Sequence, residues 1–239
     1  GDILTKLDTN ILNQVFFIID FQVCYKTECT TVPIELTIKP FLLNQSKFFD
    51  SFSTILNQPV PLSNYLSAKH YSDFEHGITN ENNTEPPTDY EVLWRRITTF
   101  VNEKCARMST STFRCEPIML CTPFKQTTQC IRYMATQGKD KDISRSVFKH
   151  IYSVDDFFDF VNKKRSITQN VNSIYTTYRP LILWDCTEAC RCEFHQKVYP
   201  RSFCCSKAIA DHLYTTICDS YKPLQQQMYQ LQQPTQTYY

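Results

Sequence analysis

The chain has 239 residues, with 25 Lys and Arg against 24 Asp and Glu, so its formal net charge is +1 at pH 7. This near-neutral balance argues against the basic surface that binds nucleic acid or anionic membranes, and we expect neither partner. Only three glycines occur, and neither GxGxxG nor GxxxxGK[ST] is present, which excludes the two common glycine-rich phosphate-binding loops.

The first part of the chain predicts a pair of strands followed by a helix. Residues 15–23 are rich in Val, Ile and Phe, and residues 34–39 alternate apolar with polar side chains, as half-buried strands do. We expect these strands to be neighbours in one sheet. Residues 47–56 place five large apolar side chains at helical spacing, which predicts a short amphipathic helix that ends before Pro59.

The middle of the chain is less uniform. Residues 90–101 fit a helix about as well as a strand, and their type stays open. Residues 114–122 are largely apolar, and residues 129–135 alternate two faces, so both segments are predicted to be strands.

A helix start is the clearest local signal. Ser153 is followed three residues later by Asp156 and then by an aromatic run, which predicts a helix over residues 155–163 with a capping box at its start. Residues 178–184 are predicted to form a strand, and Pro180 confines that strand to an edge of the sheet or to its first turn.

Twelve cysteines favour an oxidising environment, and their even number permits complete pairing within one chain or between chains. The spacing does not give the connectivity. The disulfide candidates are Cys24, Cys29, Cys105, Cys115, Cys121, Cys130, Cys186, Cys190, Cys192, Cys204, Cys205 and Cys218. Half of them crowd between residues 186 and 218. We therefore predict a main domain over residues 1–184, a Cys-rich crosslinking segment over 185–220 and a flexible Gln-rich tail over 221–239.

One cluster of soft ligands invites a zinc hypothesis. It consists of Cys186, Cys190, Cys192 and His195. Zinc sites favour paired CxxC knuckles, which this cluster lacks, and the adjacent Cys204 and Cys205 fit a disulfide mesh better. The sequence therefore predicts no metal site.

Catalytic chemistry has little support in the sequence. Five histidines could act as a general base for a cysteine nucleophile, namely His70, His76, His150, His195 and His212. No spacing selects one of them, and a chain with twelve thiols is a poor setting for one that must stay unpaired. We expect no catalytic residue, no cofactor and no enzymatic activity.

Several segments together resemble the polyhedrin and granulin family, the occlusion-body matrix proteins of insect DNA viruses. The similar segments are residues 119–125 (MLCTPFK), 130–137 (CIRYMATQ), 156–161 (DFFDFV), 178–183 (YRPLIL) and the tripeptide 64–66 (NYL). Their order and spacing follow the family from about residue 48 to 184. The twelve cysteines and the region from residue 186 onward depart from it, which is why the chain resembles an outlying, nudivirus-type polyhedrin.

The resemblance implies a mainly β fold with an antiparallel, jelly-roll-like β-sandwich core, helical decoration and a Cys-rich C-terminal extension. It implies self-assembly into a crystalline lattice that embeds virions in an occlusion body, which is expected to form in the nucleus of the infected cell. Alkali in the insect gut would release the virions, and disulfides between chains would add a need for a reductant. The alternative is a secreted, disulfide-rich binding domain, which a glycan on Asn44 or Asn82 would favour.

Overall fold

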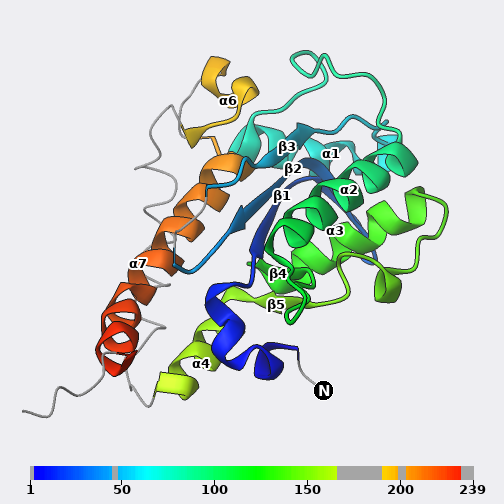
Figure 1. The fold of residues 1–239 in the computed structure, drawn as a ribbon. Helices are drawn as coiled ribbons and strands as arrows, with labels where there is room; N and C mark the ends of the chain where they lie inside the picture. The colour runs from blue at the N-terminus through cyan, green and yellow to red at the C-terminus, as the bar shows by residue number, and fades with distance from the viewer. Residues whose placement is uncertain (1–2, 45–47, 166–189, 199–202, 233–239) are drawn as a thin grey trace, which may run out of the picture.

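The computed structural model describes residues 3–44, 48–165, 190–198 and 203–232. These residues contain one five-stranded sheet in the order β3-β2-β1-β4-β5, with helices on both faces (Figure 1). The strands are β1 (Phe16–Lys26), β2 (Thr31–Phe41), β3 (Phe52–Ile55), β4 (Ile118–Cys121) and β5 (Ile151–Ser153).

The sheet is mixed. β1 and β2 form a long antiparallel hairpin in which Phe16 pairs with Phe41, and β3 adds to β2 antiparallel. β4 runs parallel to β1, and β5 runs parallel to β4. The predicted strands at residues 15–23 and 34–39 are confirmed as neighbours, but a jelly-roll sandwich is not confirmed. Helices between β3 and β5 provide the long crossovers that parallel strands need, and helices rather than a second sheet cover the described sheet.

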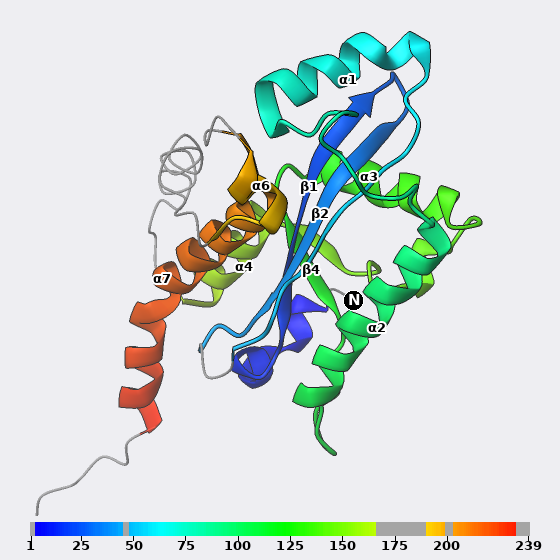
Figure 2. The same cartoon turned by 90° about the horizontal axis from the view of Figure 1, so that it is seen from above.

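Two groups of helices sandwich this sheet. The helices are α1 (Tyr65–Tyr71), α2 (Tyr90–Met108), α3 (Phe124–Gln137), α4 (Val154–Arg165), α6 (Glu193–Lys197) and α7 (Ser206–Gln232). Seen along the sheet, α2 and α3 lie on one side, whereas α4 and α7 lie on the other (Figure 2). We call these the α2 face and the α7 face. No helix in the described part of the chain is long and apolar enough to cross a membrane.

Each face has its own apolar core. On the α2 face, Phe17, Ile19 and Phe21 of β1 pack with Leu93 and Ile97 of α2. On the α7 face, the core is apolar where β1 begins. Its members include Phe16, Ile18, Leu120, Phe157 and Leu213, from β1, β4, α4 and α7.

Two predicted elements are wrong. Residues 129–135 belong to helix α3, whose buried side chains Thr127, Cys130, Ile131 and Met134 recur at spacings of three and four, so a helical period was present beneath the apparent alternation. Within residues 47–56, the segment Phe52–Ile55 is strand β3, because pairing with β2 satisfies its backbone and outweighs the helical spacing of its apolar residues.

Other elements agree with the sequence. The predicted helix at residues 155–163 is α4, and the Asp156 backbone N–H donates to Ser153 Oγ at 3.0 Å, as the capping signal indicates. The ambiguous residues 90–101 lie in α2, and residues 118–121 of the predicted strand 114–122 form β4. The strand predicted at residues 178–184 lies outside the described residues.

The Cys-rich segment contributes structure to the sheet's α7 face. α6 and the start of α7 fall within residues 185–220, and α7 continues as one helix across residue 220 to Gln232. The domain boundaries drawn at residues 184 and 220 stay a prediction.

A candidate metal centre beneath the C-terminal helices

Polar side chains occupy the centre of the α7 face. The strand register pairs Asp20 with Thr37 and Gln22 with Glu35, so these four side chains share one face of the hairpin. All four are buried, and Glu35 and Thr37 have no exposed surface. The alternation at residues 34–39 therefore indicates two covered faces, one apolar and one polar, and not a solvated side as the half-buried interpretation assumed.

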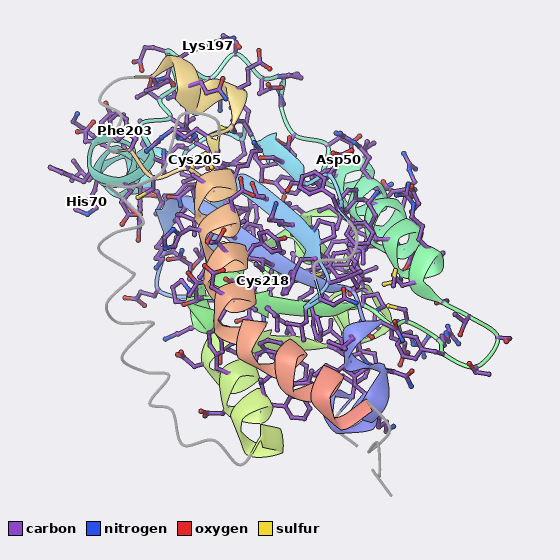
Figure 3. All side chains as sticks on the ribbon, turned by 60° about the vertical axis from the view of Figure 1, so that its left-hand side comes forward. Asp50, His70, Lys197, Phe203, Cys205 and Cys218 are labelled. Carbon is purple, nitrogen blue, oxygen red and sulfur yellow. The ribbon has the colours of Figure 1, made fainter. Side chains whose placement is uncertain are left out.

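The C-terminal helix supplies partners for this polar stretch. The Lys39 ammonium lies 2.7 Å from the Asp211 carboxylate, and the Thr37 hydroxyl lies 2.8 Å from the Ser206 hydroxyl. The Ser206 backbone N–H, at the start of α7, donates to Glu35 Oε1 at 2.6 Å. Figure 3 shows α7 lying across the sheet, with Cys205 at its beginning. Polar contacts thus join β2 to a segment about 170 residues away in sequence.

Four potential metal ligands meet at this junction: Glu35, Cys192, His195 and Cys205. One ligand atom from each lies within 4.8 Å of all the others. Cys192 Sγ is 3.2 Å from Glu35 Oε2 and 3.0 Å from His195 Nδ1, and His195 Nδ1 is 3.1 Å from Glu35 Oε2. A tetrahedral zinc ion with ordinary bond lengths separates its ligand atoms by roughly 3.3 to 3.8 Å. The cluster is compact enough to enclose one such ion.

Local structure explains why the cysteines and the histidine converge. Cys192 caps α6, and its sulfur accepts from the His195 backbone N–H at 3.4 Å, which places residues 192 and 195 on one helical turn. Cys205 immediately precedes α7 and accepts from the Cys192 backbone N–H at 3.2 Å. Backbone N–H groups at helix starts favour an anionic sulfur, the form that binds metals.

A second layer of hydrogen bonds orients His195. Its Nε2 lies 2.8 Å from the His76 carbonyl oxygen, which can only accept, so Nε2 carries the proton and Nδ1 faces the cluster. His76 is itself fixed: its Nε2 lies 2.8 Å from the Val23 carbonyl oxygen, and its Nδ1 accepts from the Ile78 backbone N–H at 2.9 Å.

Gly77 permits the close approach of the segment that carries Cys205. Its φ of 68° lies in the left-handed region, and a Cβ atom there would overlap the Phe203 ring. Figure 3 labels Phe203 close to the start of α7. The Cys204 backbone N–H donates to the Glu75 carbonyl at 2.7 Å, and Arg191 donates to the Phe203 carbonyl at 2.6 Å.

The pKa values favour the charged form of three ligands, whereas the hydrogen bond with Cys205 and burial raise the pKa of Cys192 and favour its neutral thiol. The hydrogen bond with Cys192 is the main cause that lowers the pKa of Cys205 to about 5. Burial lowers the pKa of His195, but its hydrogen bonds with Cys205 and Glu35 outweigh burial and raise that pKa to about 10. Burial also raises the pKa of Glu35, yet the contact with His195 brings it below its usual value. The cluster thus pairs anionic ligands with an imidazolium, whose Nδ1 proton a divalent cation can replace.

The donor set identifies the metal that fits. Two sulfurs, one imidazole nitrogen and one carboxylate oxygen in a compact group suit Zn²⁺, which binds all three ligand types tetrahedrally. Two of the four residues that the zinc hypothesis considered, Cys192 and His195, lie at this site. Cys190 is not among its four ligands, and Cys186 lies outside the described residues.

Sequence reasoning missed Glu35 and Cys205. Glu35 stands 157 residues before Cys192 and looked like an ordinary polar position of a half-buried strand. The signal that could have been used is the Cys192-x2-His195 spacing at a helix start with a further cysteine ten residues later. The expectation of no metal stays untested, and the geometry gives a reason to propose the opposite.

The other cysteines occupy varied positions. Cys105, Cys115, Cys121 and Cys130 are buried in the α2-face core, and Cys218 is buried in the core of the α7 face. Cys24 is buried near the end of β1, whereas Cys29 is exposed in the β1–β2 turn. The disulfides proposed for these residues stay a prediction.

The chain is thus a mixed α/β domain whose C-terminal helices are joined to its sheet through a four-ligand candidate metal centre. The family model for Maelstrom, described as a piRNA pathway germ-plasm component, matches residues 24–237. This match covers most of the sequence, and the chain belongs to the Maelstrom family. No curated protein matches it.

The family assignment corrects the functional predictions. The resemblance to polyhedrin and granulin is wrong, and with it the occlusion-body matrix, the embedded virions, the viral location and the nudivirus origin. The expectation of no nucleic-acid partner is also overturned, because the family belongs to a small-RNA pathway. The segments that suggested polyhedrin were short and individually unspecific, and one of them, residues 130–137, lies on a helix and not on the strand that the resemblance implied.

Proposed function

We propose that this chain is a zinc-organised domain that acts in the piRNA pathway of the germ line. The single observation that carries the zinc part is the convergence of Glu35, Cys192, His195 and Cys205 within 4.8 Å. The pathway part rests on membership of the Maelstrom family. The domain's partners would then be components of that pathway, RNA among them.

The zinc ion would have a structural role. Four protein ligands complete a tetrahedral coordination sphere, whereas catalytic zinc sites keep one position for water or substrate. Glu35 and His195 are almost fully buried, at 0% and 1% exposure. The ligands come from β2, α6 and the start of α7, so metal binding would join segments that are distant in sequence and add directly to folding free energy. We propose no catalytic activity for this site.

Metal content tests the proposal directly. The protein, purified without chelator, should contain one zinc per chain by mass spectrometry of the metal. Cys205→Ser should reduce zinc to background. Cys204→Ser is the matched control, because Cys204 is adjacent in sequence but is not one of the four ligands. Equal zinc in both variants, or none in the unmodified protein after refolding with zinc, would refute the site.

Cobalt substitution tests the donor set. Co²⁺ bound by two thiolates, an imidazole and a carboxylate should show thiolate-to-metal charge transfer and the intense visible bands of a tetrahedral ion. Glu35→Gln should weaken binding while leaving the charge-transfer band, since both sulfurs remain. An octahedral spectrum would contradict the proposed geometry.

The pathway role needs a test in germ cells. Replacing the protein with Cys205→Ser should lower piRNA levels in small-RNA sequencing and reduce accumulation in germ plasm, whereas Cys204→Ser should change neither. Normal piRNAs in cells that carry a zinc-free variant at normal protein abundance would separate the zinc site from the pathway function.

A further inference from the structure

One helical segment carries most of the exposed large apolar side chains of the described residues. Seven large apolar side chains are exposed among the described residues, and four of them lie within residues 62–76. Leu62, Leu66 and Phe74 are 94%, 79% and 75% exposed. This segment consists of a 3₁₀ turn (Leu62–Asn64), α1 and a π-helical turn (Ser72–His76), and α1 stands at the outer end of the β1–β2 hairpin (Figure 2). A group of exposed apolar side chains on one segment is a candidate interaction site.

The exposed side chains follow one side of the helix. Leu62, Leu66, His70 and Phe74 recur every four residues, the spacing that places side chains in one row. The His70 ring lies 5.1 Å from the Phe74 ring, and Figure 3 shows His70 on the outside of the molecule. We call these four residues the α1 stripe.

The helix is held to the domain by other residues. Ser67 Oγ accepts from the Lys26 backbone N–H at 3.1 Å, and Ala68 packs with the apolar cluster that includes Cys24 and Ile34. The α1 stripe is therefore not the face through which this helix packs in the fold. Its apolar side chains do not stabilise the fold while they are exposed to water. Burial against a partner would make them stabilising.

The charges beside the stripe indicate which partner fits. Lys69 and Asp73 lie one turn apart on the same side of the helix and form an exposed ion pair at 2.8 Å. If two copies of this helix pack antiparallel about a two-fold axis near His70, Leu66 lies opposite the partner's Phe74. The same two-fold brings Lys69 within reach of the partner's Asp73, and Asp73 within reach of the partner's Lys69. In this arrangement apolar side chains meet apolar side chains and opposite charges meet each other, so the surface is complementary to a second copy of itself.

We propose that the α1 stripe is a homodimer interface, in which residues 62–76 of two copies pair antiparallel. An interface between two short helices buries less surface than most specific protein–protein interfaces do. Association is therefore expected to be reversible, with Kd on the order of 10 μM. The α1 stripe contains none of the four metal ligands, although His76, the last residue of the segment, contacts His195 through its carbonyl oxygen.

Mass measurement at several concentrations tests the interface. By sedimentation equilibrium, the zinc-loaded protein should rise from the 28.2 kDa of one chain toward twice that mass between about 1 and 200 μM. The double variant Leu66→Asp, Phe74→Asp should stay monomeric throughout. Val92→Asp is the matched control: Val92 is an exposed apolar residue on α2, away from the stripe, and its replacement should leave dimerisation unchanged.

Charge exchange shows whether the partner is a second copy in this orientation. Lys69→Asp alone places acidic groups opposite each other across the two-fold, and Asp73→Lys alone places basic groups there, so each variant should weaken the dimer several-fold. An equimolar mixture of the two should recover it, because each acidic side then meets a basic one. A monomer at all concentrations, a dimer that survives the double Asp variant, or no recovery in the mixture would each overturn the proposal.

Discussion

Both faces of the sheet are buried, but by different physical means. On the α2 face, β1 and β2 present Ile19 and Ile38 to an apolar core. On the α7 face, neighbouring positions present Asp20, Glu35 and Lys39, which are also buried. Apolar burial is stabilising with almost any complementary partner, whereas a buried carboxylate or ammonium is costly unless specific groups pair with it.

This difference explains how each layer of helices is attached. α2 and α3 need only apolar side chains at helical spacing to cover their face. α6 and α7 need Cys192, His195 and Asp211 at defined positions, because each of these pairs with a polar group of β2. Cys205 in turn pairs with Cys192 and His195. The α2 face is thus tolerant of sequence change, and the α7 face is specific.

The largest effect is expected from two adjacent residues of β2 that face opposite ways. Glu35→Ala should destabilise the domain by about 3 to 5 kcal/mol, because it removes the acceptor of the Ser206 N–H and the partner of His195, and it should also release zinc. Leu36→Ala should cost about 2 to 5 kcal/mol through a cavity on the α2 face, with zinc retained.

Urea unfolding with and without a chelator separates these two mechanisms. Chelation should destabilise the unmodified protein and Leu36→Ala, but it should leave Glu35→Ala unchanged because that variant has already lost the metal. If Glu35→Ala responds to chelator as strongly as Leu36→Ala does, the two faces are not held by different means.

The same contrast decides which parts of the structure can be predicted from the sequence. The β1–β2 hairpin could be predicted because apolar runs and alternation are local patterns, and α4 could be predicted because Ser153 and Asp156 form a local cap. The metal cluster could not, because Glu35 and Cys205 come together only after α7 crosses the sheet.

The misassigned elements have a related cause. Residues 129–135 satisfy both a strand and a helical pattern. They form a helix because this places Ile131 and Met134 together in the core that covers the sheet. Local alternation also cannot show whether a polar face meets water or another layer of the protein. For Glu35 and Thr37, that question is answered only by Cys192, His195 and Ser206, which cover them.

A smaller effect is expected from pH, through His76 behind the cluster. Burial lowers the pKa of His76 to about 4, despite its hydrogen bond with the Val23 carbonyl. The unfolded chain takes up this proton near pH 6.5, so stability is unaffected above that pH and falls as the pH drops from about 6.5 toward 4. At pH 5 the loss attributable to His76 should be about 2 kcal/mol.

Unfolding curves at pH 7 and pH 5 measure this loss, and His76→Asn should show a smaller difference between the two pH values than the unmodified protein does. Glu35 and His195 also bear on the charge of His76, so the imidazole resonances should be followed in parallel. A His76 ring that is already protonated at pH 6 would contradict the prediction.

The smallest effect is expected where the α7 face meets solvent. The Lys39–Asp211 ion pair has N and O atoms 2.7 Å apart, with side-chain exposures of 9% and 23%. Lys39→Met keeps the apolar stem, and the Asp211 carboxylate that it leaves behind is partly hydrated, so the two charges should be coupled by only about 1 kcal/mol. A double-mutant cycle with Asp211→Asn measures this coupling, which should decrease at 1 M salt because the pair is partly exposed. A coupling several times larger would mean that this pair, and not the metal cluster, dominates the attachment of α7. A coupling near zero in low salt would mean that the Tyr214 ring, 4.9 Å from the Lys39 ammonium, stabilises that charge without Asp211.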